Sequence, residues 1–147
     1  DAEVKAINKK YPGLISVRVP RPNTAIVPNL APFFQNKHED NLKVAKQGDI
    51  EVLFMGDSIT DFWRNTDPPF AGKPVLDKHF GHLKIGNFGI AGDTTEGVLY
   101  RLQNGEGEGF SPKAIMLMIG TNNTARNNAA EIAEGIGAVV LQMQKHF

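Results

Sequence analysis

Glu51-Val-Leu-Phe-Met-Gly-Asp-Ser-Ile-Thr60 is a stretch in which an apolar run ends abruptly in glycine and small polar residues. Val52 to Met55 are four consecutive apolar residues, a pattern typical of a parallel strand that is covered on both faces. Gly56 has no Cβ, so the backbone can turn sharply after the strand. The stretch therefore predicts a buried strand that presents Ser58 at its carboxyl end, where open α/β sheets bind their ligands.

Ser58 has two readings when this stretch is taken alone. It precedes Ile59 to Arg64, where free backbone N–H groups and a helix dipole would favour a developing negative charge. Serine is also among the commonest N-cap residues, so a simple helix cap is an equal alternative. Asp57 is expected to brace the turn rather than act as a catalytic acid. Phe62 and Trp63 either line an acyl pocket or pack the helix.

Two further segments repeat the pattern of an apolar strand that ends in glycine and polar residues. Lys84 to Leu102 reads as a short strand, a glycine-rich turn and a helix, with Asp93 and Glu96 at the spacing of a capping box. Ala114 to Asn123 reads as a third strand that breaks at a glycine before two asparagines. The alternation of strands and helices predicts right-handed crossovers and a parallel sheet with helices on both faces.

These three ordered blocks resemble those of the SGNH, or GDSL-type, hydrolase family. Gly56-Asp57-Ser58 matches the block that carries the family's nucleophile. Gly92 matches the block whose glycine N–H helps to form an oxyanion hole, and Asn122 matches the asparagine that completes it. The resemblance thus favours the catalytic reading of Ser58, while Asn123 is expected to hold the loop rather than to touch substrate.

The resemblance is strongest in Asn87 to Glu106 and in Gly120 to Asn123, which look most like the branch containing the platelet-activating-factor acetylhydrolase catalytic subunits. It implies an α/β fold, a three-layer flavodoxin-like sandwich with a parallel sheet, incomplete at the carboxyl end. We expect residues 1–46 to form an amino-terminal helix and a Pro-rich extended arm packed on the domain. Residues 47–147 would be the amino-terminal part of the hydrolase domain.

The family's fourth block has no counterpart in this sequence. That block, an Asp-x-x-His near the carboxyl end, supplies the general base, and none of the four histidines has Asp three residues before it. The sequence stops at Phe147, after a long helical segment, where the family continues with further elements. We expect the base on a missing carboxyl-terminal segment or second fragment. The 147-residue chain alone would then be nearly inert, because serine is a weak nucleophile without a base.

The histidines that are present have ordinary interpretations. His79 and His82 are spaced like a metal pair, but no third ligand is in view and a solvated turn is favoured. His38 and His146 lie among charged residues on predicted helices, so we expect them to be exposed. No metal or organic cofactor is therefore predicted.

Other local signals organise the rest of the chain. Asn36 and Asn128 each have a glutamate three residues later, which predicts a capping box at the start of two helices. Pro20 to Pro32 contains four prolines and reads as an extended arm. Asn104 to Gly109 is glycine-rich and reads as a surface loop. The last helix carries one apolar stripe made of Ile132, Ile136, Val139, Val140 and Met143.

The composition is that of a globular protein able to bury one core, with 147 residues of which 41% are hydrophobic. A net charge of zero gives no attraction to nucleic acid or anionic membranes. No apolar run approaches transmembrane length. Cysteine is absent, which excludes disulfides and thiolate metal sites. Asp1 in place of Met fits a trimmed chain or a mature form after signal-peptide removal, so secretion or a periplasmic location is left open.

The resemblance implies a serine esterase that hydrolyses short-chain acyl esters, acetyl esters in particular, through an acyl-enzyme. The N–H groups of Ser58 and Gly92, with the Asn122 amide, would stabilise the tetrahedral oxyanion. Whether the alcohol is phospholipid-like or a carbohydrate is left open, as is homo-oligomer formation. The alternative is a non-catalytic binding or scaffold subunit that retains the hydrolase fold.

Overall fold

The computed structural model describes residues 2–12 and 21–147, which contain a parallel sheet of three strands. The strands are β1 (Val52–Gly56), β2 (Ile85–Gly89) and β3 (Ala114–Met118). Their order is β2-β1-β3, with β1 in the centre. Gly56 pairs with Gly89 on one side and with Met118 on the other, so all three strands end at the same edge. The predicted α/β fold with a parallel sheet is confirmed.

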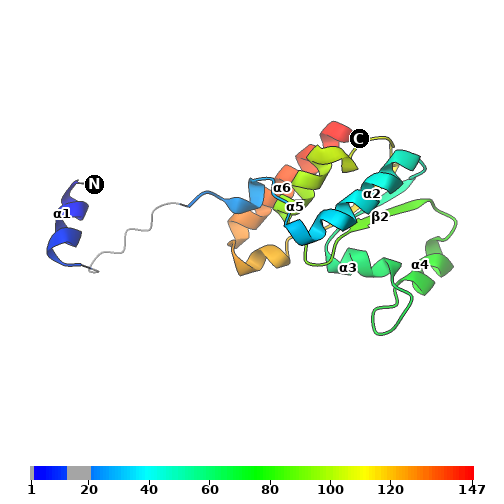
Figure 1. Ribbon diagram of the computed structural model, residues 1–147, viewed down its shortest axis with the longest axis horizontal. Coiled ribbons are helices and arrows are strands. Elements are labelled where there is room, and N and C mark those ends of the chain that lie inside the picture. The colour runs from blue at the N-terminus through cyan, green and yellow to red at the C-terminus, as the bar shows by residue number, and fades with distance from the viewer. Residues whose placement is uncertain (1, 13–20) are drawn as a thin grey trace.

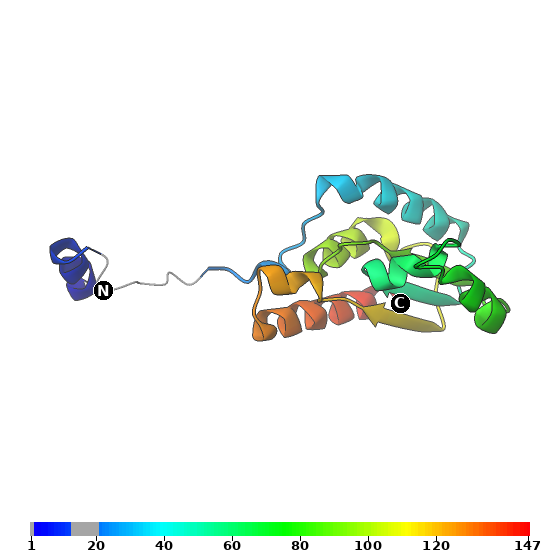
Figure 2. The same ribbon diagram turned by 90° about the horizontal axis from the view of Figure 1, so that it is seen from below.

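The described part of the chain contains six helices and several shorter helical turns. The helices are α1 (Ala2–Lys10), α2 (Gln35–Gln47), α3 (Ser58–Asp61), α4 (Lys73–Phe80), α5 (Thr95–Arg101) and α6 (Ala129–His146). The turns are η1 (Thr24–Ile26), η2 (Pro32–Phe34), η3 (Phe62–Arg64), η4 (Leu102–Glu106) and η5 (Asn122–Ala125). In two perpendicular views, α5 lies between α2 and α6 (Figures 1 and 2).

The core lies between one face of the sheet and the helices α2, α5 and α6. Its buried side chains from these elements are Ala45, Leu53, Met55, Phe88, Val98, Leu99, Val139 and Met143. Successive strand residues point to opposite faces, and the other face of β1 is less covered, since Val52 and Phe54 are only half-buried. We expected both faces of β1 to be covered, but only one face is fully buried.

The predicted apolar stripe of α6 is correct except at one residue. Val139 and Met143 are buried, but Val140 is 41% exposed, because adjacent helical residues point about 100° apart. Val140, Phe147 and the edge strand β3 line a groove of about 380 Å³. Within the described residues, β3 pairs only with β1, so its other edge is open.

The three predicted helix starts have different outcomes. The capping box of α6 is confirmed, since Glu131 N–H donates to Asn128 Oδ1 and Asn128 N–H donates to Glu131 Oε2, both at 3.0 Å. The Asn36 box is wrong: the turn η2 runs directly into α2, which begins at Gln35 without a side-chain cap. The Asp93 box is also wrong, because Thr94 is the N-cap of α5 and the Asp93 carboxylate binds elsewhere.

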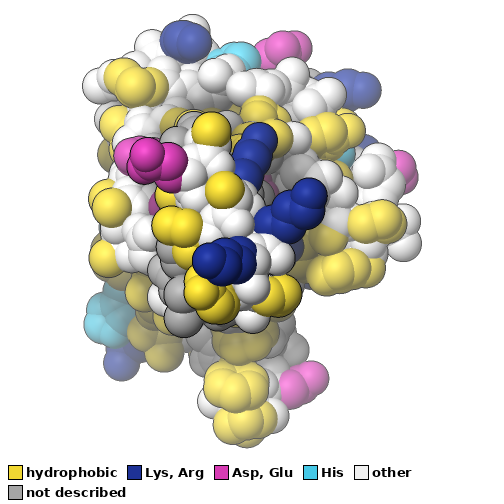
Figure 3. All heavy atoms as spheres, turned by 90° about the vertical axis from the view of Figure 1, so that its left-hand side faces the viewer, with side chains coloured by type: hydrophobic (Ala, Val, Ile, Leu, Met, Phe, Trp, Pro, Cys, Tyr) yellow, Lys and Arg dark blue, Asp and Glu magenta, His cyan; other side chains and the backbone are white. Residues whose placement is uncertain are grey.

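Residues 21–34 run along α5 and α6 before α2 begins. Arg21 forms an ion pair of 2.8 Å with Glu131, and Thr95 Oγ1 donates to the Ala25 carbonyl oxygen at 2.8 Å. Pro20, the first residue of the expected arm, lies outside the described residues. Phe33 in this segment is 78% exposed. The left-hand side of Figure 1, seen face-on in Figure 3, shows hydrophobic side chains beside several basic ones.

Candidate active site

The turn between β1 and α3 places Ser58 at the first position of a helix. A Cβ on Gly56 would lie 2.3 Å from both the Met118 carbonyl oxygen and Thr60 Oγ1, so only glycine fits there. Asp57 is buried, and its Oδ1 accepts a hydrogen bond of 3.1 Å from Ile59 N–H. Asp57 therefore braces the turn, as predicted, and leaves Ser58 half-buried at the helix start.

The loop after β2 presents Gly92 in a left-handed conformation with φ of +89°. The loop is closed by Asp93 N–H, which donates to the Ile90 carbonyl oxygen at 3.0 Å, and Ile90 N–H donates to Gly56 O at 3.0 Å. Among the described residues, no acceptor lies against the N–H of Gly92 or of Ser58. Two backbone donors are thus free on neighbouring strand ends.

The third loop, after β3, contributes Asn122 and Asn123 in different roles. Asn122 is half-buried, and its Nδ2 donates to the Asp93 carbonyl oxygen at 2.7 Å, which leaves its second amide hydrogen free to donate. Asn123 is buried and accepts from Thr95 N–H at 3.0 Å, while its Nδ2 donates to Glu96 at 2.7 Å. Asn123 therefore holds the loop, as predicted. The hydrogen bond from Asn122 connects this loop to the residue after Gly92.

A buried ionic cluster lies behind the Gly92 loop. Arg101 donates to Asp93 Oδ2 from Nε at 3.0 Å and from Nη2 at 2.7 Å, and its Nη1 binds Glu106. Glu106 also contacts His38 Nδ1 at 2.7 Å and accepts a bond from Asn41 at 3.3 Å. All five side chains are at most 4% exposed. His38 is therefore not exposed as predicted, and the expected surface loop around Glu106 contains a buried carboxylate.

Burial and neighbouring charges shift the pKa values of Asp93 and Arg101 in opposite directions. Burial raises the pKa of the Asp93 carboxyl, and the nearby Arg101 charge opposes that rise. Burial would lower the pKa of the Arg101 guanidinium, but the Glu106 and Asp93 carboxylates raise it, so Arg101 stays charged. The cluster was not predicted from the sequence. A signal was present, because His38, Asn41 and Ala45 share one face of a helix at spacings of three and four residues.

An apolar hollow of about 440 Å³ begins at the residue after Ser58. It is lined by Ile59, Phe62, Trp63, Pro69, Phe70, Ala71 and Gly72. The rings of Phe62 and Phe70 stack with centroids 4.7 Å apart. Both aromatic residues that follow Ser58 therefore line a hollow, and its use as an acyl pocket stays a prediction.

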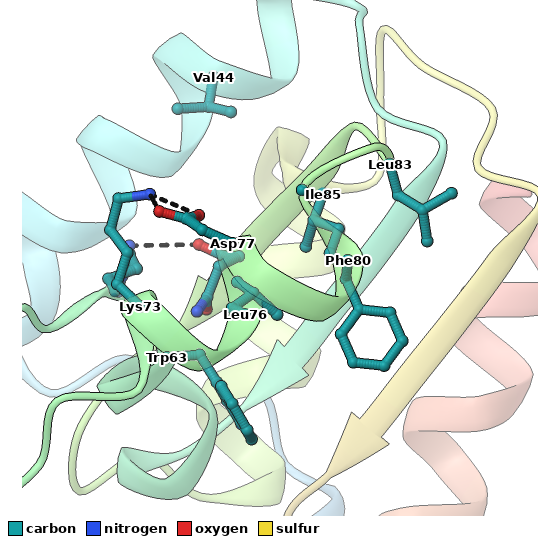
Figure 4. A pocket seen from close by; sticks show the side chains of 11 residues that line it. Val44, Trp63, Lys73, Leu76, Asp77, Phe80, Leu83 and Ile85 are labelled. Atoms are coloured by element: carbon teal, nitrogen blue, oxygen red, sulfur yellow. Dashed lines mark hydrogen bonds and ion pairs between the residues drawn. The ribbon is translucent and has the colours of Figure 1, made fainter.

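A different pocket, of about 430 Å³, lies between α4, α2 and the edge of β2 (Figure 4). Its polar side chains already have partners: Lys73 Nζ lies 2.8 Å from both carboxylate oxygens of Asp77, and Arg64 donates to the Asn87 carbonyl oxygen. None of Ser58, Gly92 and Asn122 lines it. This pocket therefore offers no candidate nucleophile.

A general base for Ser58 is not found in the described part of the chain. Ser58 has no hydrogen bond to a histidine there; His38 binds Glu106 and His146 binds Gln142. His79 and His82 are exposed. Residues 2–12 and 21–147 contain no group of three or more His, Asp or Glu that could hold a metal ion.

Comparison with known proteins identifies the family. The sequence profile of the GDSL-like lipase/acylhydrolase family matches residues 54–146, which include all three strand-end blocks. The chain belongs to this family. The resemblance inferred from the three blocks is therefore confirmed, as is the associated fold.

Several relatives of this chain are named acetylhydrolases. The chain is 37% identical to human platelet-activating factor acetylhydrolase IB subunit alpha2 over 124 residues, which are 80% of this chain and 51% of the relative. It is 35% identical to the Drosophila melanogaster subunit beta homolog over 108 residues, 74% of this chain and 44% of the relative. The rat subunit alpha1 is 36% identical over 101 residues, 69% and 40% of the two chains. The chain thus spans about half the length of the curated relatives it matches.

No helix in the described ranges of this chain is both long and apolar enough to cross a membrane.

Proposed function

We propose that this chain carries the nucleophile and the oxyanion hole of a serine esterase that hydrolyses short acyl esters, acetyl esters in particular. The observation that carries the proposal is the meeting of three loops at one edge of the sheet, with the free N–H groups of Ser58 and Gly92 and a spare amide hydrogen on Asn122. The acetyl preference is supported by the names of the relatives, which are acetylhydrolases.

The reaction would proceed in two steps. Ser58 Oγ attacks the ester carbonyl carbon while a base accepts its proton, and the carbonyl oxygen becomes an oxyanion that receives hydrogen bonds from Ser58, Gly92 and Asn122. The alcohol then leaves with a proton, and water hydrolyses the acyl-enzyme by the same route. Such donors are effective because they are fixed before the charge develops.

The base is the part of the machinery that the described residues do not supply. We propose that a histidine beyond residue 147 reaches Ser58 and that the 147-residue chain alone is nearly inert. The proposal is supported by relatives of which the matched segment covers only about half, and by the open edge of β3 beside an apolar groove. Comparing acetate-ester turnover of residues 1–147 with that of the full-length protein tests it, and equal turnover per molecule would contradict it.

A non-catalytic scaffold is the second candidate, because Ser58 has no histidine partner among residues 2–12 and 21–147. The two candidates differ in reactivity. An esterase is labelled at Ser58 by an organophosphonate, whereas a scaffold without a base is not labelled at a useful rate.

Replacing Asn122 by alanine is expected to lower kcat by about 10²–10³-fold with a much smaller change in KM. The lost hydrogen bond strengthens mainly as negative charge develops on the oxyanion. Steady-state kinetics on a chromogenic acetate ester measure the effect. The matched change Asn123→Ala should instead lower stability, since Asn123 is buried and holds Thr95 and Glu96. A loss confined to substrate affinity in Asn122→Ala would contradict its proposed role.

A further inference from the structure

Asp61 is a buried carboxylate close to Ser58 that the proposed chemistry does not use. It is the last residue of α3, three positions after Ser58, and only 7% exposed. Its Oδ2 accepts a hydrogen bond of 2.9 Å from Ala91 N–H, and its Oδ1 accepts one of 3.1 Å from Arg64 Nε. One carboxylate therefore joins the helix that carries Ser58 to the residue before Gly92.

Arg64 strengthens the same connection from the next turn. Its Nη1 donates to the Asn87 carbonyl oxygen at 3.2 Å, and its Nη2 donates to that of Gly89. A Cβ on Gly89 would lie 2.4 Å from Asp61 N, so glycine lets α3 approach the end of β2 directly. The ion pair between Asp61 and Arg64 thus fixes both the end of β2 and the start of the loop that follows it.

Gly92 is consequently held from both sides. Before it, Ala91 N–H is bound to Asp61 Oδ2; after it, the Asp93 carbonyl oxygen is bound by Asn122 and the Asp93 carboxylate by Arg101. Glycine at φ of +89° has more conformational freedom than other residues, so the direction of its N–H depends on these flanking contacts.

We propose that Asp61 is a positioning residue that sets the Gly92 N–H relative to Ser58 Oγ. This inference rests on the proposed esterase function. Asp61 is unsuited to act as the base, because Arg64 and the more distant Lys37, at 3.5 Å, already surround its Oδ1. Its negative charge near a developing oxyanion would by itself slow the reaction. Asp61 must therefore favour the reaction through the position that it gives the Gly92 N–H, and not through its charge.

The variant Asp61→Asn separates geometry from charge. Asparagine has the same shape, but its single oxygen cannot accept from both Ala91 and Arg64. We expect kcat on a chromogenic acetate ester to fall about 10-fold or more, somewhat less than on removing a donor, with KM changed by no more than about two-fold. If charge dominated, kcat would stay the same or rise, which would overturn the proposal.

The experiment uses the full-length protein and a matched control. Asp40→Asn breaks another ion pair spaced by three residues, between Asp40 and Lys43, but both of those side chains are well exposed, so turnover should be unchanged. Arg64→Lys keeps the charge and loses the planar fork, and it should lower kcat in the same direction as Asp61→Asn. It also serves as a second test should Asp61→Asn fold poorly.

Two further measurements distinguish a positioning role of Asp61 from a loss of folded protein. Titration of active serines with an organophosphonate corrects kcat for unfolded protein, and a loss of turnover that disappears after this correction would overturn a positioning role. Amide hydrogen exchange at Ala91 and Gly92 should speed up in Asp61→Asn. Faster exchange with unchanged kcat would also overturn it. If the wild-type protein itself shows no Ser58-dependent turnover, the proposed function has failed, and the positioning role fails with it for that separate and visible reason.

Discussion

Ser58→Ala in the full-length protein is expected to abolish release of acetate from a chromogenic ester, with kcat lower by on the order of 10⁶-fold, as for other activated serines. Removal of Oγ leaves no nucleophile at the only position where the carboxyl end of β1 meets the two other described strand ends. Labelling by an organophosphonate should be lost in parallel. The fold should persist, because Ser58 is half-buried and no other described residue depends on its side chain.

A second serine provides the control for that experiment. Ser111 is exposed in the loop before β3, and Ser111→Ala should retain full turnover and labelling. Thr60 is a rival hydroxyl two positions after Ser58, and its Oγ1 is buried without a hydrogen-bond partner in the described structure. Undiminished labelling of Ser58→Ala would assign the nucleophile elsewhere, and mass mapping of the label would then identify the residue.

Arg101→Met is expected to lower the free energy of unfolding by about 3–5 kcal/mol, because it leaves buried carboxylates without a compensating charge. Asp93 and Glu106 are both fully buried beside Arg101. Urea denaturation followed by circular dichroism measures the loss. Arg21→Met is the matched control: Arg21 is 51% exposed in its ion pair with Glu131, so its removal should cost no more than about 1 kcal/mol.

The destabilisation by Arg101→Met should also depend on pH. Burial already raises the pKa of Asp93, and loss of the guanidinium removes the charge that opposes this rise. A group whose folded pKa is raised contributes more stability at low pH and loses it as pH increases through the folded pKa. The variant should therefore be closer to wild type at pH 5 than at pH 8. A deficit that is equal at both values, or larger at pH 5, would contradict this electrostatic explanation.

The strand-end blocks were predictable because local sequence determines them. A buried strand leaves an apolar run, a sharp turn requires a glycine such as Gly56, and parallel strands end at one edge. That edge brings Ser58, Gly92 and Asn122 onto neighbouring loops, although their catalytic roles stay predictions. The α6 capping box was equally predictable, since Asn128 and Glu131 form hydrogen bonds with each other within one helical turn.

The errors arose where a polar side chain has a distant partner. Asp93 and Glu96 have the spacing of a cap, but the Asp93 carboxylate binds Arg101, eight residues away. His38 resembles a surface residue among charged neighbours, yet it binds Glu106, 68 residues later. Spacing within a helix can indicate which face is buried, but it does not identify the distant partner. Asp61 was missed for the same reason, because its carboxylate joins α3 to Ala91, 30 residues later in the chain.

The segment that precedes α2 has a consequence for the order in which the fold can form. Arg21 donates to Arg126 and Glu131, and Asn23 donates to Glu131 and Glu134, so these bonds join residues 105 to 111 positions apart. None of them can exist on the ribosome until the chain beyond β3 has been synthesised. Contacts of such long range also form slowly, since a large loop must close first. Residues 21–34 are therefore made before α5 and α6 but are among the last to take their place.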